Sequence, residues 1–251
     1  MKKTGLLLFL FVVMAYAQPT VEEVLQKIDY NQRMGKDVKA RVVMTQKKAS
    51  QGAKVLDMMY YRRDSDNSFL ITMTAPEAEK GNGYLRVGDN FWMYRKNTRT
   101  FQHVNRDESI GGSEASAEDF ETRKVTELYK PALDDERNEK ISEETLGKIP
   151  VYRVEVTAKV HDVSYPKKIY WVRKDNFLPL KEQSFAGSGT LMVTAYYLNY
   201  TELEERFIPV KQLYIDEFEK GNKTIVELSG ISLEDVDDQI FTKAYLENLS
   251  K

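Results

Sequence analysis

Residue types that carry catalysis or bind metals are sparse in this 251-residue chain. It has no cysteine, and its two histidines, His103 and His161, lie far apart in the sequence. No group of His, Asp and Glu has the spacing of a zinc site. The acidic run at 134–144 lacks the alternating carboxylates and central glycine of a calcium loop, and favours a solvated hairpin. The sequence therefore predicts no metal site and no cofactor.

Short motifs for nucleophilic or nucleotide chemistry are also missing. The GGS at 111–113 and the GSG at 187–189 do not fit the G-x-S-x-G turn that exposes a catalytic serine. The GNGYLR at 81–86 lacks the third glycine and the following helix of a dinucleotide site, and is better explained as a turn. We therefore expect that the protein is not an enzyme. A serine triad assembled from distant residues would leave no local motif, so a lipid-active hydrolase stays open as an alternative.

The N-terminal residues have the composition of an export signal. Residues 1–17, MKKTGLLLFLFVVMAYA, combine two lysines, an apolar run and small residues near the end. Because the apolar run is too short to span a bilayer, the pattern predicts a signal peptide cleaved after Ala17. The rest, 18–251, has no linker-like or repetitive stretch, and we expect it to form a single domain. Without cysteine, packing alone must hold the exported fold together.

The charge balance argues against nucleic acid as a partner. The formal net charge of the whole chain is −2, and removal of Lys2 and Lys3 with the signal peptide makes the remainder more acidic. A nucleic-acid-binding domain would instead carry a basic surface.

The elements that would position a site are one helix and many strands. Thr20 and Glu23 form a capping-box pattern, and apolar residues between 21 and 28 recur at helical spacing, which predicts a helix ending near Gly35. From residue 38 the apolar period changes to two.

Strand patterns fill most of the remaining chain. The alternation is cleanest at 152–160 and stops between 107 and 130, where a short helix carrying Phe120 and capped by Ser113 or Ser116 is expected. We count about ten or eleven strands, with a short helix or packed tail at the end. So many consecutive antiparallel strands must curl, split into two layers or close, since open twisted sheets rarely exceed about ten strands.

A strand at 90–94 carries apolar side chains on both faces. Phe91 and Met93 point one way, and Trp92 and Tyr94 point the other way. Both faces must therefore be covered. Either one pair belongs to the ordinary core while the other packs under a helix or loop, or one pair lines a cavity for an acyl chain.

These motifs resemble a known family. Residues 74–101, TAPEAEKGNGYLRVGDNFWMYRKNTRTF, are similar to outer-membrane lipoprotein-sorting proteins of the LolA/LolB-like group. The similar features are Pro76, Lys80-Gly81, Leu85 and a Gly-Asp-x-x-Trp-x-Tyr motif. Three further segments look like later parts of the same family: Gly112-Ser113, Asp119-Phe120 and residues 167–185. The resemblance therefore runs through roughly residues 20–231.

The resemblance implies a fold and a function. The fold is mainly β (α+β), a curled antiparallel sheet forming an incomplete barrel capped by short helices. The function is that of a periplasmic carrier, expected to be a monomer, that binds the acyl chains of lipoproteins or other lipids in an apolar cavity and shuttles them toward the outer membrane. Its partners would be an inner-membrane export or lipid-transport complex and an outer-membrane acceptor.

The resemblance also points to site residues. We expect the acyl chain to bind through apolar side chains of the sheet, and an arginine near the end of the second strand to contact a lid. Sequence alone does not decide between Arg62 and Arg63 for that contact. The expected lipid-binding residues are Tyr60, Phe69, Ile71, Met73, Leu85, Trp92, Tyr94, Val154 and Trp171.

A second function of a different class fits the same resemblance. The protein could be a lipid-sensing regulatory or scaffold module of an envelope-stress system, which would hold a single membrane-protein partner persistently. A carrier, in contrast, would capture many lipoproteins. The lipid itself and the identity of the donor and acceptor proteins stay open at this point.

Overall fold

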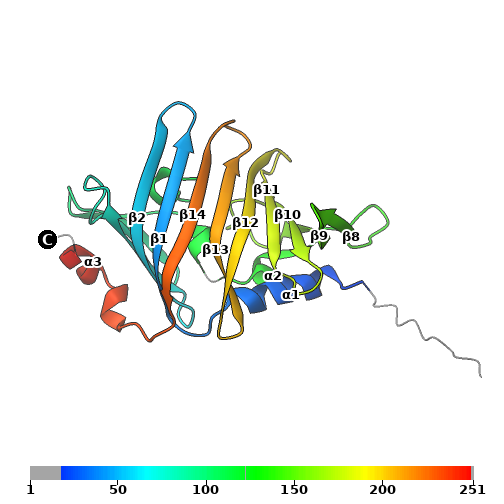
Figure 1. The fold of residues 1–251 in the computed structure, drawn as a ribbon, viewed down its shortest axis with the longest axis horizontal. Coiled ribbons are helices and arrows are strands. Elements are labelled where there is room, and N and C mark those ends of the chain that lie inside the picture. The colour runs from blue at the N-terminus through cyan, green and yellow to red at the C-terminus, as the bar shows by residue number, and fades with distance from the viewer. Residues whose placement is uncertain (1–17, 122, 250–251) are drawn as a thin grey trace, which may run out of the picture.

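The computed structural model describes residues 18–121 and 123–249, in which fourteen strands form one antiparallel sheet (Figure 1). The predicted signal peptide, 1–17, lies outside the described residues. The strand order is β6-β5-β4-β3-β2-β1-β14-β13-β12-β11-β10-β9-β7, and β8 pairs with β9 beside this path. The expectation of a mainly antiparallel, unclosed sheet with few short helices is confirmed.

Most strands that follow one another in the chain pair as antiparallel hairpins. Their bounds are β1 (Val38–Lys48), β2 (Gly52–Arg63), β3 (Ser68–Ala75), β4 (Gly83–Val87), β5 (Asn90–Arg95), β6 (Thr100–His103), β7 (Tyr129–Pro131), β8 (Ile141–Leu146), β9 (Ile149–Ala158), β10 (Lys167–Arg173), β11 (Pro179–Phe185), β12 (Leu191–Leu203), β13 (Arg206–Asp216) and β14 (Lys223–Ser232). The expected count of ten or eleven was slightly low, in part because the short β7 and the polar β8 carry no clear apolar alternation.

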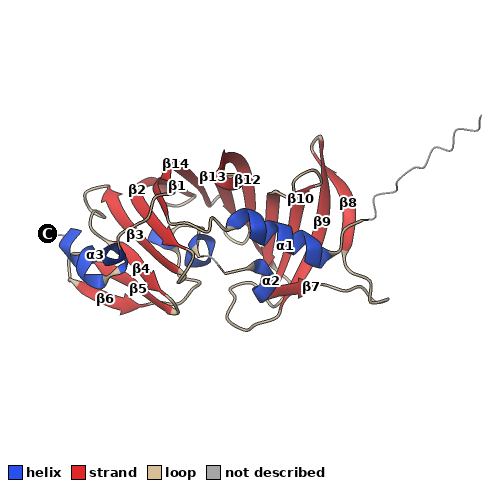
Figure 2. Cartoon of the chain, turned by 90° about the horizontal axis from the view of Figure 1, so that it is seen from below, coloured by secondary structure: helices blue, strands red, loops and turns tan. Residues whose placement is uncertain are grey.

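The sheet has two halves that meet at one strand pair. Strands β1 to β6 lie in chain order on one side, strands β9 to β14 lie in chain order on the other, and β1 pairs with β14 between them. Figure 2 shows β1, β14, β13 and β12 at the top of the view, with β3 to β6 lower on one side and β7 lower on the other, so the two halves curve around a common concave side. Because β6 and β7 end the path without pairing to each other, the barrel is incomplete.

Helix α1 (Val21–Gln32) covers the concave face of β9 and β10 (Figure 2). Its capping box is present, with Thr20 Oγ1 accepting from the Glu23 N–H and the Glu23 carboxylate accepting from the Thr20 N–H. Its apolar stripe is buried among valines and tyrosines of the sheet. The helix ends at Gln32, slightly before the predicted end near Gly35.

A covering segment, residues 105–121, lies over the concave face of the other half. It contains the 3-10 turns η1 (Ile110–Gly112) and η2 (Ala117–Phe120) and is followed by helix α2 (Val125–Leu128). Ser116 and Asp119 form a capping box at η2, so one of the two expected caps of a short helical turn carrying Phe120 is confirmed. Ile110 and Phe120 join the core formed with β1 to β5.

The C-terminal segment, 233–249, covers the convex face of β2 to β5. Its elements are η3 (Asp238–Phe241) and α3 (Lys243–Leu249), and Leu246 is fully buried there. Trp92 and Tyr94 belong to this outer cluster, whereas Phe91 and Met93 belong to the concave core. The strand with two apolar faces is therefore covered by ordinary core on one side and by the C-terminal segment on the other.

Among the helices of the described residues, none combines the length and the apolar composition that a bilayer-spanning helix needs.

The tight fit of the C-terminal segment makes a testable prediction at Gly83. A Cβ at this position would lie 2.5 Å from the carbonyl oxygen of Ile71 and 2.8 Å from Cδ1 of Leu246. Gly83→Ala should therefore lower the free energy of unfolding by about 1–3 kcal/mol, measured by urea denaturation.

Gly187 supplies the matched control. A Cβ there has its nearest neighbour, Cγ of Pro166, at 4.0 Å, so Gly187→Ala should change stability by less than about 0.5 kcal/mol. Equal stability of both variants would show that α3 does not press against β4 as described.

Candidate functional site

The concave face carries two kinds of surface. One apolar core joins β1 to β5 with β12 to β14 under the covering segment, and another joins β9 and β10 with α1 and α2. Between these cores the floor is formed by β10 to β14 and is rich in tyrosine and charged side chains. This middle strip is where the sheet is left partly uncovered.

A cavity of about 180 Å³ lies over this strip. Its roof comes from the end of α1, the end of the covering segment and α2. Its floor side chains include Lys168, Tyr170, Glu182, Tyr197, Phe207, Ile208, Gln212, Tyr214, Val226 and Leu228. The cavity is smaller than the roughly 300–1,000 Å³ of typical small-molecule sites, so a long chain fits only if the roof moves.

Side chains of β2 hold the roof. The Tyr60 hydroxyl donates to the carbonyl oxygen of Phe120 at 2.8 Å, and the two rings meet edge to face at 5.5 Å. Burial raises the pKa of Tyr60 to about 12, so this hydroxyl stays protonated and remains a donor. Nη2 of Arg62 donates to the carbonyl oxygen of Gln32, at the end of α1, at 2.8 Å.

The neighbouring arginines have different partners. Arg62 lines the cavity and pairs with Asp64 at 2.6 Å. Arg63 points to the other face, where it pairs with Asp37 at 2.9 Å and its guanidinium lies over the Phe241 ring. Of the two residues proposed for a lid contact, Arg62 is the one that touches an element covering the cavity.

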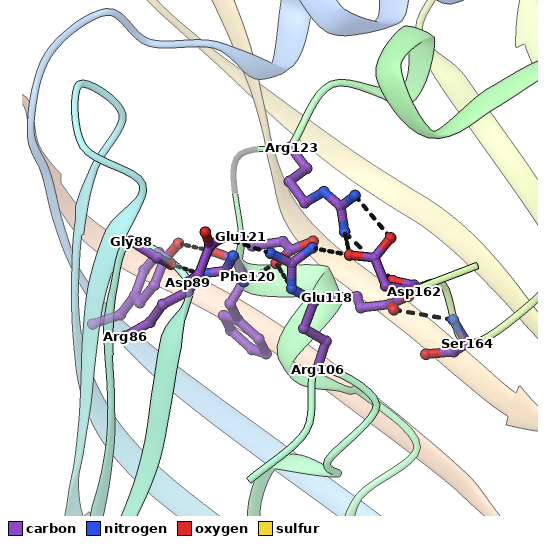
Figure 3. A network of polar contacts seen from close by, with 11 residues as sticks. Arg86, Gly88, Asp89, Arg106, Glu118, Phe120, Glu121, Arg123, Asp162 and Ser164 are labelled. Atoms are coloured by element: carbon purple, nitrogen blue, oxygen red, sulfur yellow. Dashed lines mark hydrogen bonds and ion pairs between the residues drawn. The ribbon is translucent and has the colours of Figure 1, made fainter. Parts of the chain in front are cut away.

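An ion-pair bridge links the two halves of the sheet beside the cavity (Figure 3). It consists of Arg86 on β4, Arg106 and Glu121 on the covering segment, Arg123, and Asp162 in the β9–β10 hairpin. Arg86 pairs with Glu121, and both side chains are almost fully buried. The bridge therefore closes part of the gap that the missing strand pairing leaves.

The outer end of the bridge is more exposed. The Asp162 carboxylate accepts from Nη1 of Arg106 at 3.1 Å and from Nη1 of Arg123 at 2.9 Å, and its side chain is 58% exposed. Beside it, the Ser164 N–H donates to the Glu118 carboxylate at 3.0 Å. Since exposed pairs contribute little and buried pairs are costly to break, the strength of the bridge resides at Arg86 and Glu121.

A second hollow, of about 290 Å³, lies between β4, β5 and the 108–112 turn. Its exposed lining is mainly polar, whereas that of the cavity over β10 to β14 is mainly apolar. The polar groups are the ionisable side chains of Glu79, Arg95 and Glu108 and the amide of Asn82. An alkyl chain would desolvate these groups without replacing their partners. We therefore place the candidate site at the cavity over β10 to β14.

The structure separates the residues that the sequence analysis grouped as lipid-binding. Tyr60 lines the cavity, and Phe69, Ile71 and Met73 belong to the concave core beside it. Val154 is also on the concave side, under α1.

The placement of the other four residues is corrected. Leu85, Trp92 and Tyr94 lie on the convex face under the C-terminal segment, and Trp171 lies in a convex cluster with Val151 and Ile169. Alternation along a strand predicts which residues share a face of the sheet. It does not predict which face is concave, because that depends on which distant segment of the chain covers each face.

Most residues of the cavity floor were not predicted from the sequence. The run KKIYWVR in β10 is apolar or long-chained on both faces, so its alternation does not single out Lys168 and Tyr170. One sequence feature could have identified the floor. Lys168 and Glu182 occupy concave positions on neighbouring strands, and their opposite charges fit a contact across the β10–β11 hairpin.

No group of three or more His, Asp or Glu side chains within residues 18–121 and 123–249 is placed to hold a metal ion.

An unclosed, curled antiparallel sheet with a helix-roofed concave cavity is the LolA-like fold. Residues 65–248 match the model of a family described as "Uncharacterized protein", and the chain belongs to that family. None of the curated proteins compared with the chain matches it.

Solved structures share this fold over most of the chain. A LolA superfamily protein from Nitrosomonas europaea is 21% identical, with a TM-score of 0.76 over 91% of this chain and 100% of its own. A DUF1329 family protein from Desulfovibrio piger is 18% identical, with a TM-score of 0.79 over 90% of this chain and 97% of its own.

A third solved structure carries a functional description. It is a domain from Vibrio parahaemolyticus described as an outer membrane lipoprotein-sorting protein, and it is 18% identical. Its TM-score is 0.77 over 90% of this chain and 97% of its own. At these identities the likeness shows the fold.

The two ends of the ion-pair bridge should respond differently to substitution. Glu121→Gln leaves the buried Arg86 guanidinium without its anion and should lower the free energy of unfolding by about 3–5 kcal/mol. Asp162→Asn removes a largely exposed carboxylate and should cost less than about 1 kcal/mol. Urea denaturation measures both, and an Asp162→Asn effect as large as that of Glu121→Gln contradicts this account.

Asp119 should give the stability a distinct pH dependence. Burial raises the pKa of its carboxyl group from 3.8 to about 6, so the folded state holds the proton more tightly than the unfolded state. This contribution to stability is present below pH 4 and is lost as the pH rises to 6. Asp119→Asn does not titrate and should gain stability relative to the wild type across this window. Because the Asp119 side chain is exposed to solvent, screening keeps this gain well below the roughly 3 kcal/mol that the pKa shift alone implies.

Asp134→Asn is the control for that measurement. Hydrogen bonds from Asn138 lower the pKa of the Asp134 carboxyl group, so this variant should lose stability relative to the wild type as the pH rises. The Asp134 contribution changes below about pH 4 and that of Asp119 between about pH 4 and 6, so denaturation midpoints are measured from pH 2 to 7. Midpoints that shift in the same direction for both variants would refute the assignment of Asp119.

Proposed function

We propose that this protein is a carrier that binds the acyl chains of lipoproteins or other lipids and moves them toward the outer membrane. The observation that carries the proposal is the cavity on the concave face, between apolar cores and under a roof held by side chains. The likeness to the lipoprotein-sorting domain supports it at the level of the fold.

The physical task of such a carrier is to replace water around an alkyl chain. Each buried methylene contributes about 0.8 kcal/mol, so a chain of roughly sixteen carbons needs on the order of 10 kcal/mol of apolar surroundings. A cavity bordered by aromatic and aliphatic side chains can supply much of this. The task needs no catalytic group, and we propose no reaction for this site.

Loading requires the roof to move. Among the contacts that hold it are hydrogen bonds from Tyr60 and Arg62 to backbone carbonyls of Phe120 and Gln32. These bonds can break without disturbing the strand ladder below. A ligand that binds the open form more tightly than the closed form then shifts the population toward the open form.

The remaining parts of the proposal concern place and partners. We propose that residues 1–17 are a cleaved signal peptide, that 18–251 act as a single domain in the periplasm, and that lipid passes from an inner-membrane complex to an outer-membrane acceptor. Concave residues of the binding surface would be Tyr60, Phe69, Ile71, Met73 and Val154, together with Phe120 and Leu228.

The proposal is tested by filling the cavity. Leu228→Trp places a larger ring among the lining residues and should weaken binding of palmitate-based probes at least about tenfold. Native mass spectrometry of the protein purified from cells should show a lipid adduct in the wild type and little or none in this variant.

Ile225→Trp provides the control. Ile225 lies on the same strand but has the opposite parity to the buried Val226 and to Leu228, so its side chain faces away from the cavity. Its substitution should leave the adduct unchanged. A bare wild-type polypeptide that takes up no added acyl probe overturns the proposal, and persistent capture of a single membrane protein by crosslinking favours a regulator instead.

A further inference from the structure

Neighbouring strands place polar side chains in the cavity floor, where an alkyl chain needs apolar ones. Lys168 on β10, Glu182 on β11 and Tyr197 on β12 all line the cavity. Their positions follow from alternation, because Ile169 and Trp171 occupy the convex face of β10. The floor is thus amphipathic, with a charged pair near its centre and apolar cores beyond it.

In this charged pair, Glu182 has more hydrogen-bond partners than Lys168. Nζ of Lys168 lies 2.6 Å from Oε1 of Glu182, and the side chains are 16% and 13% exposed. Glu182 also accepts from the Ser184 hydroxyl at 3.1 Å and from the Tyr197 hydroxyl at 3.2 Å. In the described part of the chain Glu182 is the one hydrogen-bond acceptor of the Lys168 ammonium, which has three N–H donors. Its Nζ also lies 5.6 Å from the centroid of the Tyr129 ring.

Lys168 keeps its charge in this setting. Burial lowers its pKa, but the attraction of Glu182 and the nearby Tyr170 and Tyr129 outweighs burial and raises the pKa well above its usual range. A buried ion pair of this kind rarely stabilises a protein more than apolar side chains of the same size. Stability alone therefore does not explain why a charged lysine faces the cavity.

We infer that Lys168 is a specificity-determining residue that binds the ester or amide carbonyl of an acyl lipid inside the cavity. The carbonyl oxygen accepts from the ammonium N–H groups that Glu182 leaves free, and the chain extends over the neighbouring apolar surface. This inference rests on the proposed function, since it names the part of the lipid that the same cavity recognises.

The charges of the site favour an uncharged acceptor over a free fatty acid. The cavity lining as a whole carries both acidic and basic side chains, but the acidic groups that interact with Lys168 are Asp119 and Glu182. Their carboxylates would repel a ligand carboxylate that approached the ammonium. An ester or amide carbonyl offers the same acceptor oxygen without that repulsion. The expected class is therefore a neutral, ester- or amide-linked acyl chain.

The test uses ligands that differ in the carbonyl. The whole protein is titrated at pH 8 with 1-palmitoylglycerol and with 1-O-hexadecylglycerol, which has the same head group and chain length but an ether in place of the ester. The wild type should bind the ester about tenfold more tightly than the ether. Palmitate should bind more weakly than the ester.

Variants assign the preference to Lys168. Lys168→Met should bring the two dissociation constants together while binding of the ether stays within about threefold of the wild type. Because this change leaves Glu182 without its cation, Lys168→Met/Glu182→Leu is measured beside it. Lys181→Met is the control, since Lys181 lies over the Trp171 and Tyr196 rings on the convex face and should leave the preference intact.

The outcomes separate this inference from the proposed function. Equal binding of ester and ether by the wild type, or a preserved preference in a folded Lys168 variant, overturns the inference and leaves the carrier proposal standing. Failure of the wild type to bind either glycerol lipid overturns both. A preference lost with Lys168→Met and kept with Lys181→Met supports the inference.

Discussion

The pairing of β1 with β14 is the constraint on which the rest of the structure depends. It joins the first hairpins of the chain to the last, in a register that sets Val42 opposite Leu228 and Met44 opposite Val226. The two halves are thereby held as one twisted surface with a shared concave side. Because nothing pairs β6 with β7, the apolar residues of that side must be covered by helices and loops of the same chain.

The covering is unequal, and that inequality creates the cavity. The covering segment seals one half with Ile110 and Phe120, and α1 seals the other with its apolar stripe. Neither reaches fully over the strip between them. The strip is lined by tyrosines and by the Lys168–Glu182 pair, which tolerate a partly wet setting better than leucine or valine would.

Local patterns in the sequence predicted the elements better than their partners. Thr20 and Glu23 identified the start of α1, and period-two alternation identified most strands and the opposite directions of Phe91 and Trp92. What alternation could not show is which face becomes concave, since the C-terminal segment that covers Trp92 lies more than 140 residues further along the chain. The cavity floor escaped prediction for the same reason.

The contacts around the cavity differ in a way that decides which part can open. The floor strands are held by continuous backbone ladders, from β10 through β14, whose disruption would expose many unpaired backbone groups at once. The roof is held by side chains reaching single carbonyls and by a bridge whose Asp162 end is exposed to water. Since water can replace the exposed contacts at little cost, the roof opens more easily than the sheet.

The buried pair of Arg86 and Glu121 then limits how far the covering segment can lift, because separating these charges is costly while they remain out of water. An opening that keeps this pair intact and releases the end of α1 would admit a chain from the side of Gln32 rather than from the side of β4.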